Sequence, residues 1–290
     1  MSQKQQKCSL PKINEGNYYN TEINMAYVSV SQYKSFMGTP DTEPCEALAL
    51  AEAKGEYTRP SHSTSLLIGS YVDAALTGDL EVFKLEHPEI YSSRGSTKGE
   101  LKSDFKQAQE MIDRARRDET FMQFLEGNHQ VIQTGEIEGV PFKIKIDNVA
   151  YLNGKPVAIV DLKTVKKMYE GMWVKDSGEN ITWVEKWNYD LQGACYQYIY
   201  EQNTGLKLPF YIAAISKDKD SDGVAHPRLK IIQIPQFKLD ERLAEVKANI
   251  WKVQALKNGE IKPIHCKKCD YCADTLPCEV ISLDELVLEL

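Results

Sequence analysis

Residues 142–147 read Phe-Lys-Ile-Lys-Ile-Asp, and residues 157–163 read Val-Ala-Ile-Val-Asp-Leu-Lys. Side chains alternate between the two faces of a β-strand, so the two lysines of the first segment share a face with Asp147. Asp161 and Lys163 are two residues apart and share a face of the second segment in the same way. A carboxylate and an amine at the end of an otherwise apolar strand are unusual. The sequence therefore predicts two strands that present charged side chains at one place.

The connection between these strands decides whether the two aspartates meet. Asn153-Gly154 lies between them and favours a tight β-hairpin. With a regular two-residue loop, Asp147 pairs with Val160, and Asp161 then points to the other face. A loop with an odd number of residues, or one β-bulge, brings both aspartates to the same face. We therefore expect an odd register, such as a three-residue loop with a bulge.

The residue types suggest metal-assisted phosphodiester hydrolysis. Two aspartates can hold Mg²⁺, a hard cation that prefers carboxylate oxygens, against a scissile phosphate. A lysine beside them can orient the attacking water or stabilise negative charge in the transition state. Asp147, Asp161 and Lys163 are therefore candidate catalytic residues. The alternative is a structural ion pair at the edge of a sheet.

The rest of the chain predicts an α/β fold with a central mixed sheet flanked by helices. We expect an N-terminal arm over residues 1–28 and a single domain over residues 29–290, with a cysteine-rich segment at about 264–280. Strands are expected at 129–138, 140–151, 156–164, 209–216 and 228–235. Helices are expected at 29–37, 44–54, 63–77, 183–203 and 239–256, and from Thr97 to about 117.

These motifs resemble a known nuclease superfamily. Asp147 followed by Asp161-Leu162-Lys163 resembles the PD-(D/E)xK signature, and Gln192-Gly193-Ala194-Cys195-Tyr196 resembles the Q-x-x-x-Y element of its RecB-like branch. Within that branch the chain looks most like the RecE-like exonucleases of phage and prophage recombination, over about residues 29 to 280. The resemblance implies a restriction-endonuclease-like core in which Gln192 and Tyr196 help to position water or DNA.

The same resemblance implies a function. It suggests a Mg²⁺- or Mn²⁺-dependent DNA exonuclease that digests linear duplex ends and leaves a single strand for an annealing protein. Because related exonucleases work as rings, it also implies a homo-oligomer. One alternative is a catalytically inactive module of the same fold that binds DNA or a protein. The other is a zinc-bound interaction protein in which the carboxylates are incidental.

One position departs from the RecB-like pattern. That branch usually has a histidine metal ligand in a Gly-x-x-x-His motif, whereas this chain has Gly69-Ser70-Tyr71-Val72-Asp73. A carboxylate can still bind Mg²⁺, so Asp73 is a third candidate metal ligand beside Asp147 and Asp161. The bland alternative is that Asp73 caps a helix or forms a salt bridge.

The C-terminal cysteines indicate a second metal site. Four cysteines lie between residues 266 and 278, and thiolates this close favour a soft metal, either Zn²⁺ or an iron–sulfur cluster. Cys269-x2-Cys272-x5-Cys278 resembles the iron–sulfur staple of AddB-type and CRISPR-adaptation nucleases. That resemblance implies a distant fourth ligand, for which Cys45 is suitably placed. Cys266 is an alternative ligand in a local zinc site. The remaining alternative is that the cysteines are free and bind no metal.

Charge and hydropathy set the broader expectations. The formal net charge is −7, which argues weakly against nucleic acid because phosphate contacts need lysine and arginine. Acidic metal ligands would weaken that objection, since bound cations invert the local field. The sequence contains neither an apolar run long enough to cross a bilayer nor an apolar signal segment. We therefore expect a cytoplasmic protein with reduced cysteines and no membrane partner.

Overall fold

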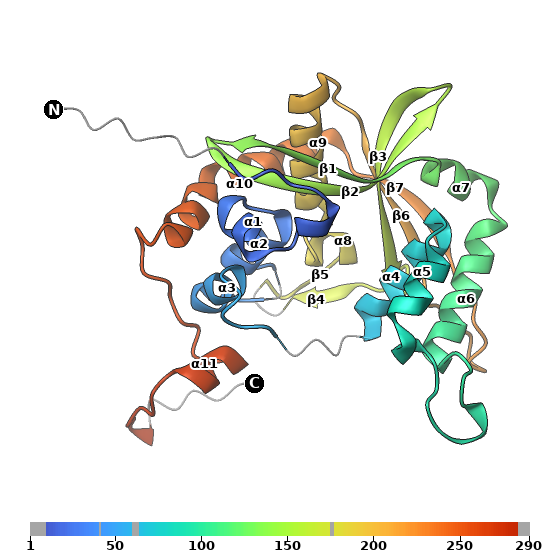
Figure 1. Cartoon of the computed structure of the whole chain (residues 1–290), viewed down its shortest axis with the longest axis horizontal. Helices are drawn as coiled ribbons and strands as arrows, with labels where there is room; N and C mark the ends of the chain where they lie inside the picture. Colours follow the sequence, from blue (N-terminus) through green and yellow to red (C-terminus); the bar gives the residue numbers. More distant parts are fainter. Residues whose placement is uncertain (1–9, 41, 60–63, 175–176, 284–290) are drawn as a thin grey trace.

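A five-stranded mixed sheet lies at the centre of the molecule, in the spatial order β1-β2-β3-β6-β7 (Figure 1). The computed structural model describes residues 10–40, 42–59, 64–174 and 177–283. Neighbouring strands run antiparallel except β3 and β6, which are parallel. This sheet confirms the predicted α/β fold. Its strands are β1 (Gly127–Ile137), β2 (Val140–Leu152), β3 (Lys155–Val165), β6 (Phe210–Ser216) and β7 (Leu229–Gln233).

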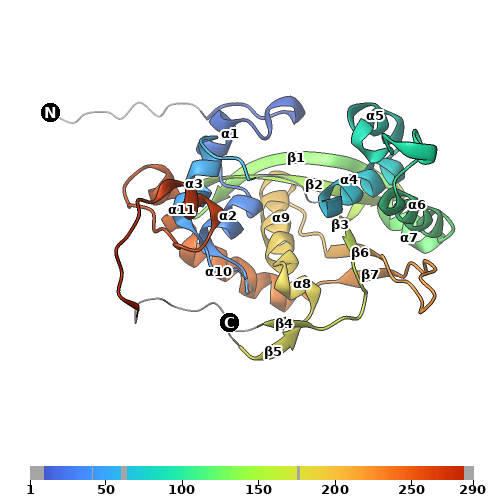
Figure 2. The same cartoon turned by 90° about the horizontal axis from the view of Figure 1, so that it is seen from below.

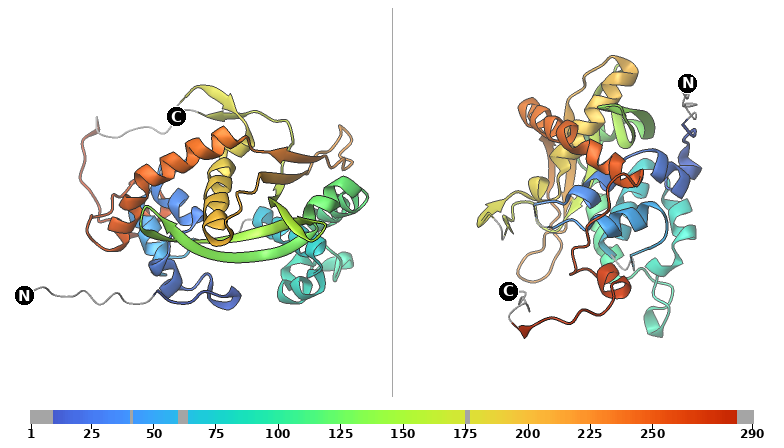
Figure 3. Two further views of the ribbon diagram at one scale, coloured as in Figure 1. Left: turned by 90° about the horizontal axis from the view of Figure 1, so that it is seen from above. Right: turned by 90° about the vertical axis from the view of Figure 1, so that its left-hand side faces the viewer.

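Helices cover both faces of this sheet and bury two apolar cores (Figure 3). One core packs α9 (Tyr189–Thr204) and α10 (Gln236–Lys257) against the sheet, together with the N-terminal helices. Phe142, Ile144 and Ile146 point into this core, as the alternation in β2 predicts. The other core lies under α4 (Thr64–Thr77), α5 (Leu80–Glu86), α6 (Ser103–Arg116) and α7 (Glu119–Leu125).

The predicted N-terminal arm packs against the domain from residue 10 onward. It contains α1 (Thr21–Ala26) and leads into α2 (Val30–Met37) and α3 (Glu46–Ala53). Ile23 and Val28 are fully buried, and Val28 forms a parallel bridge with Phe142 of β2. The buried ammonium of Lys143 donates to the carbonyl oxygen of Tyr18. Residues 10–28 are therefore part of the fold that supports β2.

Two predicted helices differ from those observed. The expected helix from Thr97 to about 117 begins only at Ser103, because Gly99 takes a left-handed conformation with φ +87°. The expected helix over 183–203 is divided into α8 (Trp183–Lys186) and α9. The break falls at Asn188, whose φ of +51° is also left-handed. This break turns the first turn of α9 toward the ends of β2 and β3.

Smaller elements complete the described chain. A short hairpin, β4 (Met172–Val174) with β5 (Glu179–Ile181), lies below the main sheet (Figure 2). The last helix, α11 (Asp270–Thr275), lies beside α3 in the views of Figures 1 and 2, far from it in sequence. Within the part of the chain that is described, no helix has the length and apolar character that a membrane span requires.

Candidate active site

The register of β2 and β3 brings Asp147 and Asp161 to the same place. The hairpin closes with Leu152 opposite Lys155, around the two-residue loop Asn153-Gly154. The pairing then shifts between Ala150 and Tyr151, and beyond this β-bulge Asn148 lies opposite Val160. The next residues outward are Asp147 and Asp161, which therefore oppose each other. The predicted bulge is confirmed, whereas the suggested three-residue loop is wrong.

Lys163 lies between the two carboxylates. Its Nζ is 2.5 Å from Oδ2 of Asp161 and 4.0 Å from Oδ2 of Asp147. Burial opposes the charged form of Lys163, but the charges of Asp161 and Asp147 outweigh it and raise the pKa of this ammonium. Burial raises the pKa of the Asp147 carboxyl, and the nearby charge of Asp161 raises it further. The site thus concentrates negative charge around one lysine.

Backbone and helix contacts fix the orientation of the two aspartates. The backbone N–H of Leu162 donates to Oδ2 of Asp147 at 3.0 Å. The side-chain amide of Gln192, on α9, donates to Oδ1 of Asp161 at 2.7 Å. Tyr196 lies one turn further along α9 and is buried, and the charges of Asp161 and Asp147 add to burial in raising its pKa. Both residues of the Q-x-x-x-Y motif therefore face the aspartates.

Asp73 approaches the site from the opposite side, on α4. It lines a small cavity together with Asp147, His129 and Leu162. Its Oδ2 accepts a hydrogen bond from the side-chain amide of Gln130 at 3.2 Å. Burial raises the pKa of Asp73, and the charge of His129 partly opposes this rise. Asp73 therefore faces the site, although the oxygens of the three aspartates do not all lie within 4.8 Å of one another.

The carboxylates fit a hard divalent cation. Asp161 is almost fully buried, and its Oδ2 lies 2.5 Å from Nζ of Lys163. Carboxylate oxygens are the ligands that hard divalent cations prefer. Asp147 and Asp161 could hold Mg²⁺ or Mn²⁺ between them, and Asp73 could add a third carboxylate.

Three residues near this site escaped the sequence analysis. The ring of Tyr189 lies 5.0 Å from Nζ of Lys163 and 5.2 Å from Nζ of Lys34. Burial and the charge of Lys163 lower the pKa of Lys34 to about 8. Tyr19 is 73% exposed, and the charge of Asp147 contributes to its raised pKa. Lys34 and Tyr19 belong to the N-terminal segment, and no local sequence pattern connects them with β2 or β3.

The cysteine cluster differs from the predicted ligand set. Cys45 lies directly before α3, and its Sγ is 3.7 Å from Sγ of Cys272 at α11. The sulfur atoms of Cys45, Cys266, Cys269 and Cys272 all lie within 4.8 Å of one another. Cys278, predicted as a ligand, is exposed, lies outside this set and contacts the carbonyl oxygen of Glu279. The group therefore contains Cys266, the alternative ligand of the sequence analysis, and not Cys278. The cluster could hold a metal ion.

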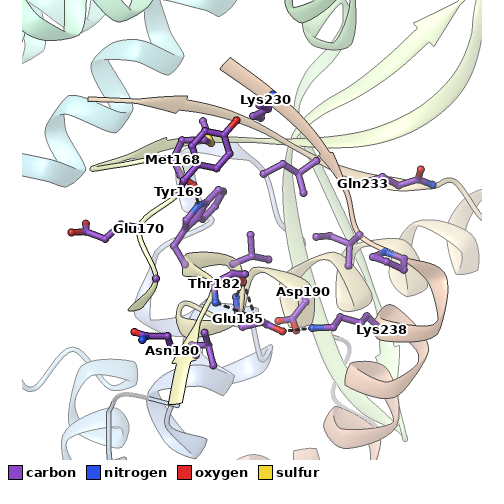
Figure 4. A pocket seen from close by; sticks show the side chains of 17 residues that line it. Met168, Tyr169, Glu170, Asn180, Thr182, Glu185, Asp190, Lys230, Gln233 and Lys238 are labelled. Carbon is purple, nitrogen blue, oxygen red and sulfur yellow. Dashed lines mark hydrogen bonds and ion pairs between the residues drawn. The ribbon is translucent and has the colours of Figure 1, made fainter. Parts of the chain in front are cut away.

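A larger cavity lies away from the aspartates. It has a volume of about 800 Å³ and is bounded by the β4–β5 hairpin, α8 and β7 (Figure 4). Its walls are mostly apolar, with Tyr169 at the rim and Lys238 paired with Glu185 inside. No residue singled out in the sequence analysis lines it.

A mixed sheet that presents two acids and a lysine on adjacent strands, supported by a helix carrying Gln192 and Tyr196, is the arrangement of a PD-(D/E)xK domain. The chain belongs to the family described as a PDDEXK-like domain of unknown function (DUF3799), whose model matches residues 29–275. No curated protein matches the chain.

One solved structure is similar over nearly the whole chain. It is the crystal structure of a candidate exonuclease from Eubacterium rectale, 42% identical, with a TM-score of 0.85. The alignment covers 97% of this chain and 100% of that one. The crystal structure of SSO0001 aligns over 79% of this chain and 91% of that one, at 12% identity and a TM-score of 0.26.

Proposed function

We propose that this protein is a Mg²⁺- or Mn²⁺-dependent deoxyribonuclease. The observation that carries the proposal is the meeting of Asp147, Asp161 and Lys163 at one point of the sheet, with Lys163 between the carboxylates. The family description and the similar crystal structure of a candidate exonuclease support the same reading.

Each side chain of the site has its own role in the proposed reaction. Asp147 and Asp161, with Asp73, would hold the divalent cation, which supplies positive charge at the scissile phosphate when bound. Lys163 can donate a hydrogen bond to the attacking water or to a phosphate oxygen, and its raised pKa keeps it charged. Gln192 holds Asp161 in one orientation. Tyr196 is a positioning residue through its place beside Gln192 on α9.

We further propose that the substrate is the end of a linear DNA duplex, as in RecE-like exonucleases of phage or prophage recombination. A single-strand annealing protein as partner, a homo-oligomer and a cytoplasmic location complete this proposal. Its support is the resemblance in motif order and the exonuclease assignment of the similar crystal structure. The competing hypothesis is an inactive DNA- or protein-binding module, for which the presence of Asp73 in place of histidine is the supporting feature.

The test is digestion of linear duplex DNA with Mg²⁺ or Mn²⁺ by the wild type, Asp161→Ala and Lys163→Ala. We expect the wild type to degrade DNA and each variant to lose more than about a hundredfold in rate. Covalently closed circular duplex of the same sequence should survive if the enzyme requires an end. If all three proteins behave alike, the nuclease proposal fails and the inactive binding module remains as the hypothesis.

For the cysteine cluster we propose a single structural Zn²⁺ ion. Zinc–sulfur bonds of about 2.3 Å in a tetrahedron place the sulfurs roughly 3.8 Å apart. The separation of 3.7 Å between Cys45 and Cys272, and the limit of 4.8 Å for the whole set, support this size. An iron–sulfur cluster places several iron and sulfide atoms between its thiolates and spreads them further apart.

Metal analysis of anaerobically purified protein tests this assignment. We expect one zinc ion per chain and no visible absorption. Iron together with sulfide and a visible absorption band would instead assign an iron–sulfur cluster to these cysteines. Absence of both metals would remove the metal-binding role of the cysteines.

A further inference from the structure

A groove lies between α2 and the cysteine cluster. Its volume is about 240 Å³, and we call it the Lys34–Trp187 groove. Its polar and aromatic wall comes from α2, from the break between α8 and α9, and from the chain after α3. Its lining includes Lys34, Ser35, Glu43, Arg59, Trp187, Cys266 and Cys269.

Lys34 connects this groove with the aspartates. Its Nζ and that of Lys163 lie at similar distances, 5.2 and 5.0 Å, from the ring of Tyr189. The charge of Asp161 also acts on Lys34. The ring of Tyr189 therefore lies near both ammonium groups, and Lys34 links the groove to the catalytic residues.

The positively charged side chains of the groove differ in whether a carboxylate neutralises them. Arg59 forms a two-point contact with Glu52, at 2.6 and 3.0 Å. Glu43, the acidic residue of the lining, pairs with Lys268. Lys34 instead donates to the carbonyl oxygen of Trp187 at 2.7 Å and faces the ring of Tyr189, both of which are uncharged. An ammonium has three donors, so Lys34 can bind an anionic group while keeping the bond to Trp187.

Trp187 adds an aromatic side chain to the lining of the same groove. Its side chain is 44% exposed, whereas the neighbouring Trp183 is buried. A cation beside an exposed aromatic ring is the combination that binds single-stranded nucleic acid, because phosphates contact the cation and bases stack on the ring. The groove has room for a nucleotide-sized group.

We propose that the Lys34–Trp187 groove binds a single strand of DNA next to the catalytic aspartates. Lys34 contacts a phosphate and Trp187 stacks on a base. Cys266 and Cys269 form the far wall, so the cysteine cluster holds that wall in place. This inference rests on the proposed nuclease function, for which it names one strand of the substrate or product as the occupant of the groove.

The test measures binding of a short fluorescent single-stranded oligonucleotide to the full chain carrying Asp161→Asn, which prevents cleavage. In that background Trp187→Ala should weaken binding about tenfold, and Trp187→Phe should retain most of the affinity because it keeps a ring. Lys34→Gln should weaken binding and reduce the slope of log affinity against log salt by about 0.7. Blunt duplex DNA should be affected less than single-stranded DNA.

Two matched variants control for general effects. Trp251→Ala removes an exposed tryptophan of α10, and Lys155→Gln removes an exposed lysine at the start of β3. Both should bind the oligonucleotide like the parent, and melting temperatures identify any misfolded variant. Parental affinity in both Trp187→Ala and Lys34→Gln would overturn the groove assignment, as would equal weakening for duplex and single strand. Cleavage by the wild type is scored separately, so loss of the nuclease proposal would be recognised independently.

Discussion

Asp147 stands opposite Asp161 across β2 and β3 because Val157 is an extra residue in β3. Ala150 pairs with Ala158, and Tyr151 pairs with Pro156, so Val157 has no partner in β2. Side chains alternate with a period of two, so this one residue decides which face Asp161 occupies relative to the hairpin turn. The bulge therefore links the geometry of the turn to the chemistry of the site.

Deletion of Val157 should leave the two aspartates opposed. Without it, Pro156 and Ala158 become consecutive and keep their present partners, so the hairpin becomes regular. Val157 is 39% exposed, and its loss removes little buried surface. We expect the deletion variant to cleave linear duplex DNA at a rate within about fivefold of the wild-type rate. The regular hairpin keeps the present pairing from Ala150 and Ala158 onward, so Asp147 still faces Asp161. A folded deletion variant with no activity would contradict this account of the register.

Gln192 should contribute to the rate through Asp161. Gln192→Ala removes the hydrogen bond of 2.7 Å to Oδ1 of Asp161 and should lower single-turnover cleavage about 10- to 100-fold. Gln192→Glu should lower it further, because a second carboxylate would then face Asp161. Gln202→Ala is the matched control, since Gln202 is on the same helix but contacts the backbone of β1 at Glu136. Rates equal to that control would remove Gln192 from the site.

The sequence predicted the sheet and the acid pair because both depend on local regularities. Alternation in β2 and β3 identified the strands. The Asn-Gly dipeptide indicated a tight hairpin, in which a bulge is needed to bring both aspartates to the same face. The four-residue spacing of Gln192 and Tyr196 placed both on one side of α9, which is again a local property. These features needed no knowledge of distant contacts.

The features that were missed depend on the packing of distant segments. Lys34 reaches the site only because α2 packs beside α9, and nothing in its own neighbours signals this. Cys266 and Cys278 lie in the same short run, so spacing alone could not tell which of them would face Cys45. The left-handed backbone at Gly99, which delays α6, depends on a local turn that competes with helix formation.

Loss of the cysteine cluster should destabilise the fold. Cys45 and Cys272 join α3 to α11 across most of the chain, and a metal that closes so long a loop stabilises the folded state. We expect Cys45→Ser to lower the melting temperature by several degrees and to lose the bound metal. Cys278→Ser, outside the cluster, should change neither. The opposite pattern would restore Cys278 as a ligand.

Replacement of two helical glycines by alanine should change the stability of the protein in opposite directions. A Cβ at Gly193 of α9 would lie 2.4 Å from the ring of Phe210, which is fully buried in β6. Gly193→Ala should therefore destabilise the protein by about 1–3 kcal/mol despite the higher helix propensity of alanine. At Gly69 of α4 the nearest atom is Thr164 Oγ1 at 3.6 Å, so Gly69→Ala should stabilise by up to about 1 kcal/mol. Denaturant unfolding of both variants measures the difference, and equal signs would contradict the close approach of α9 to β6.

Lys257 should make the stability of the fold depend on pH above neutrality. Its ammonium is buried at the end of α10 and donates to the carbonyl oxygen of Tyr27 at 2.8 Å. Burial, and then the charge of Lys143, lower its pKa to about 7. The unfolded chain keeps a pKa near 10.4, so it binds more protons than the folded chain between about pH 7 and 10. Stability contributed by this group therefore rises with pH in that window and is lost as pH falls toward 7.

Comparison with Lys257→Met isolates this effect. Methionine removes the charge and preserves most of the side-chain length, although the carbonyl oxygen of Tyr27 loses a donor. Between pH 7 and 9 the wild type should gain up to about 1.4 kcal/mol per pH unit relative to the variant. Lys252→Met is the control, because Lys252 is on the same helix but pairs with Glu46 at 2.6 Å. Parallel curves for the wild type and Lys257→Met would show that Lys257 stays protonated in the fold, and that the contacts of its ammonium offset the burial.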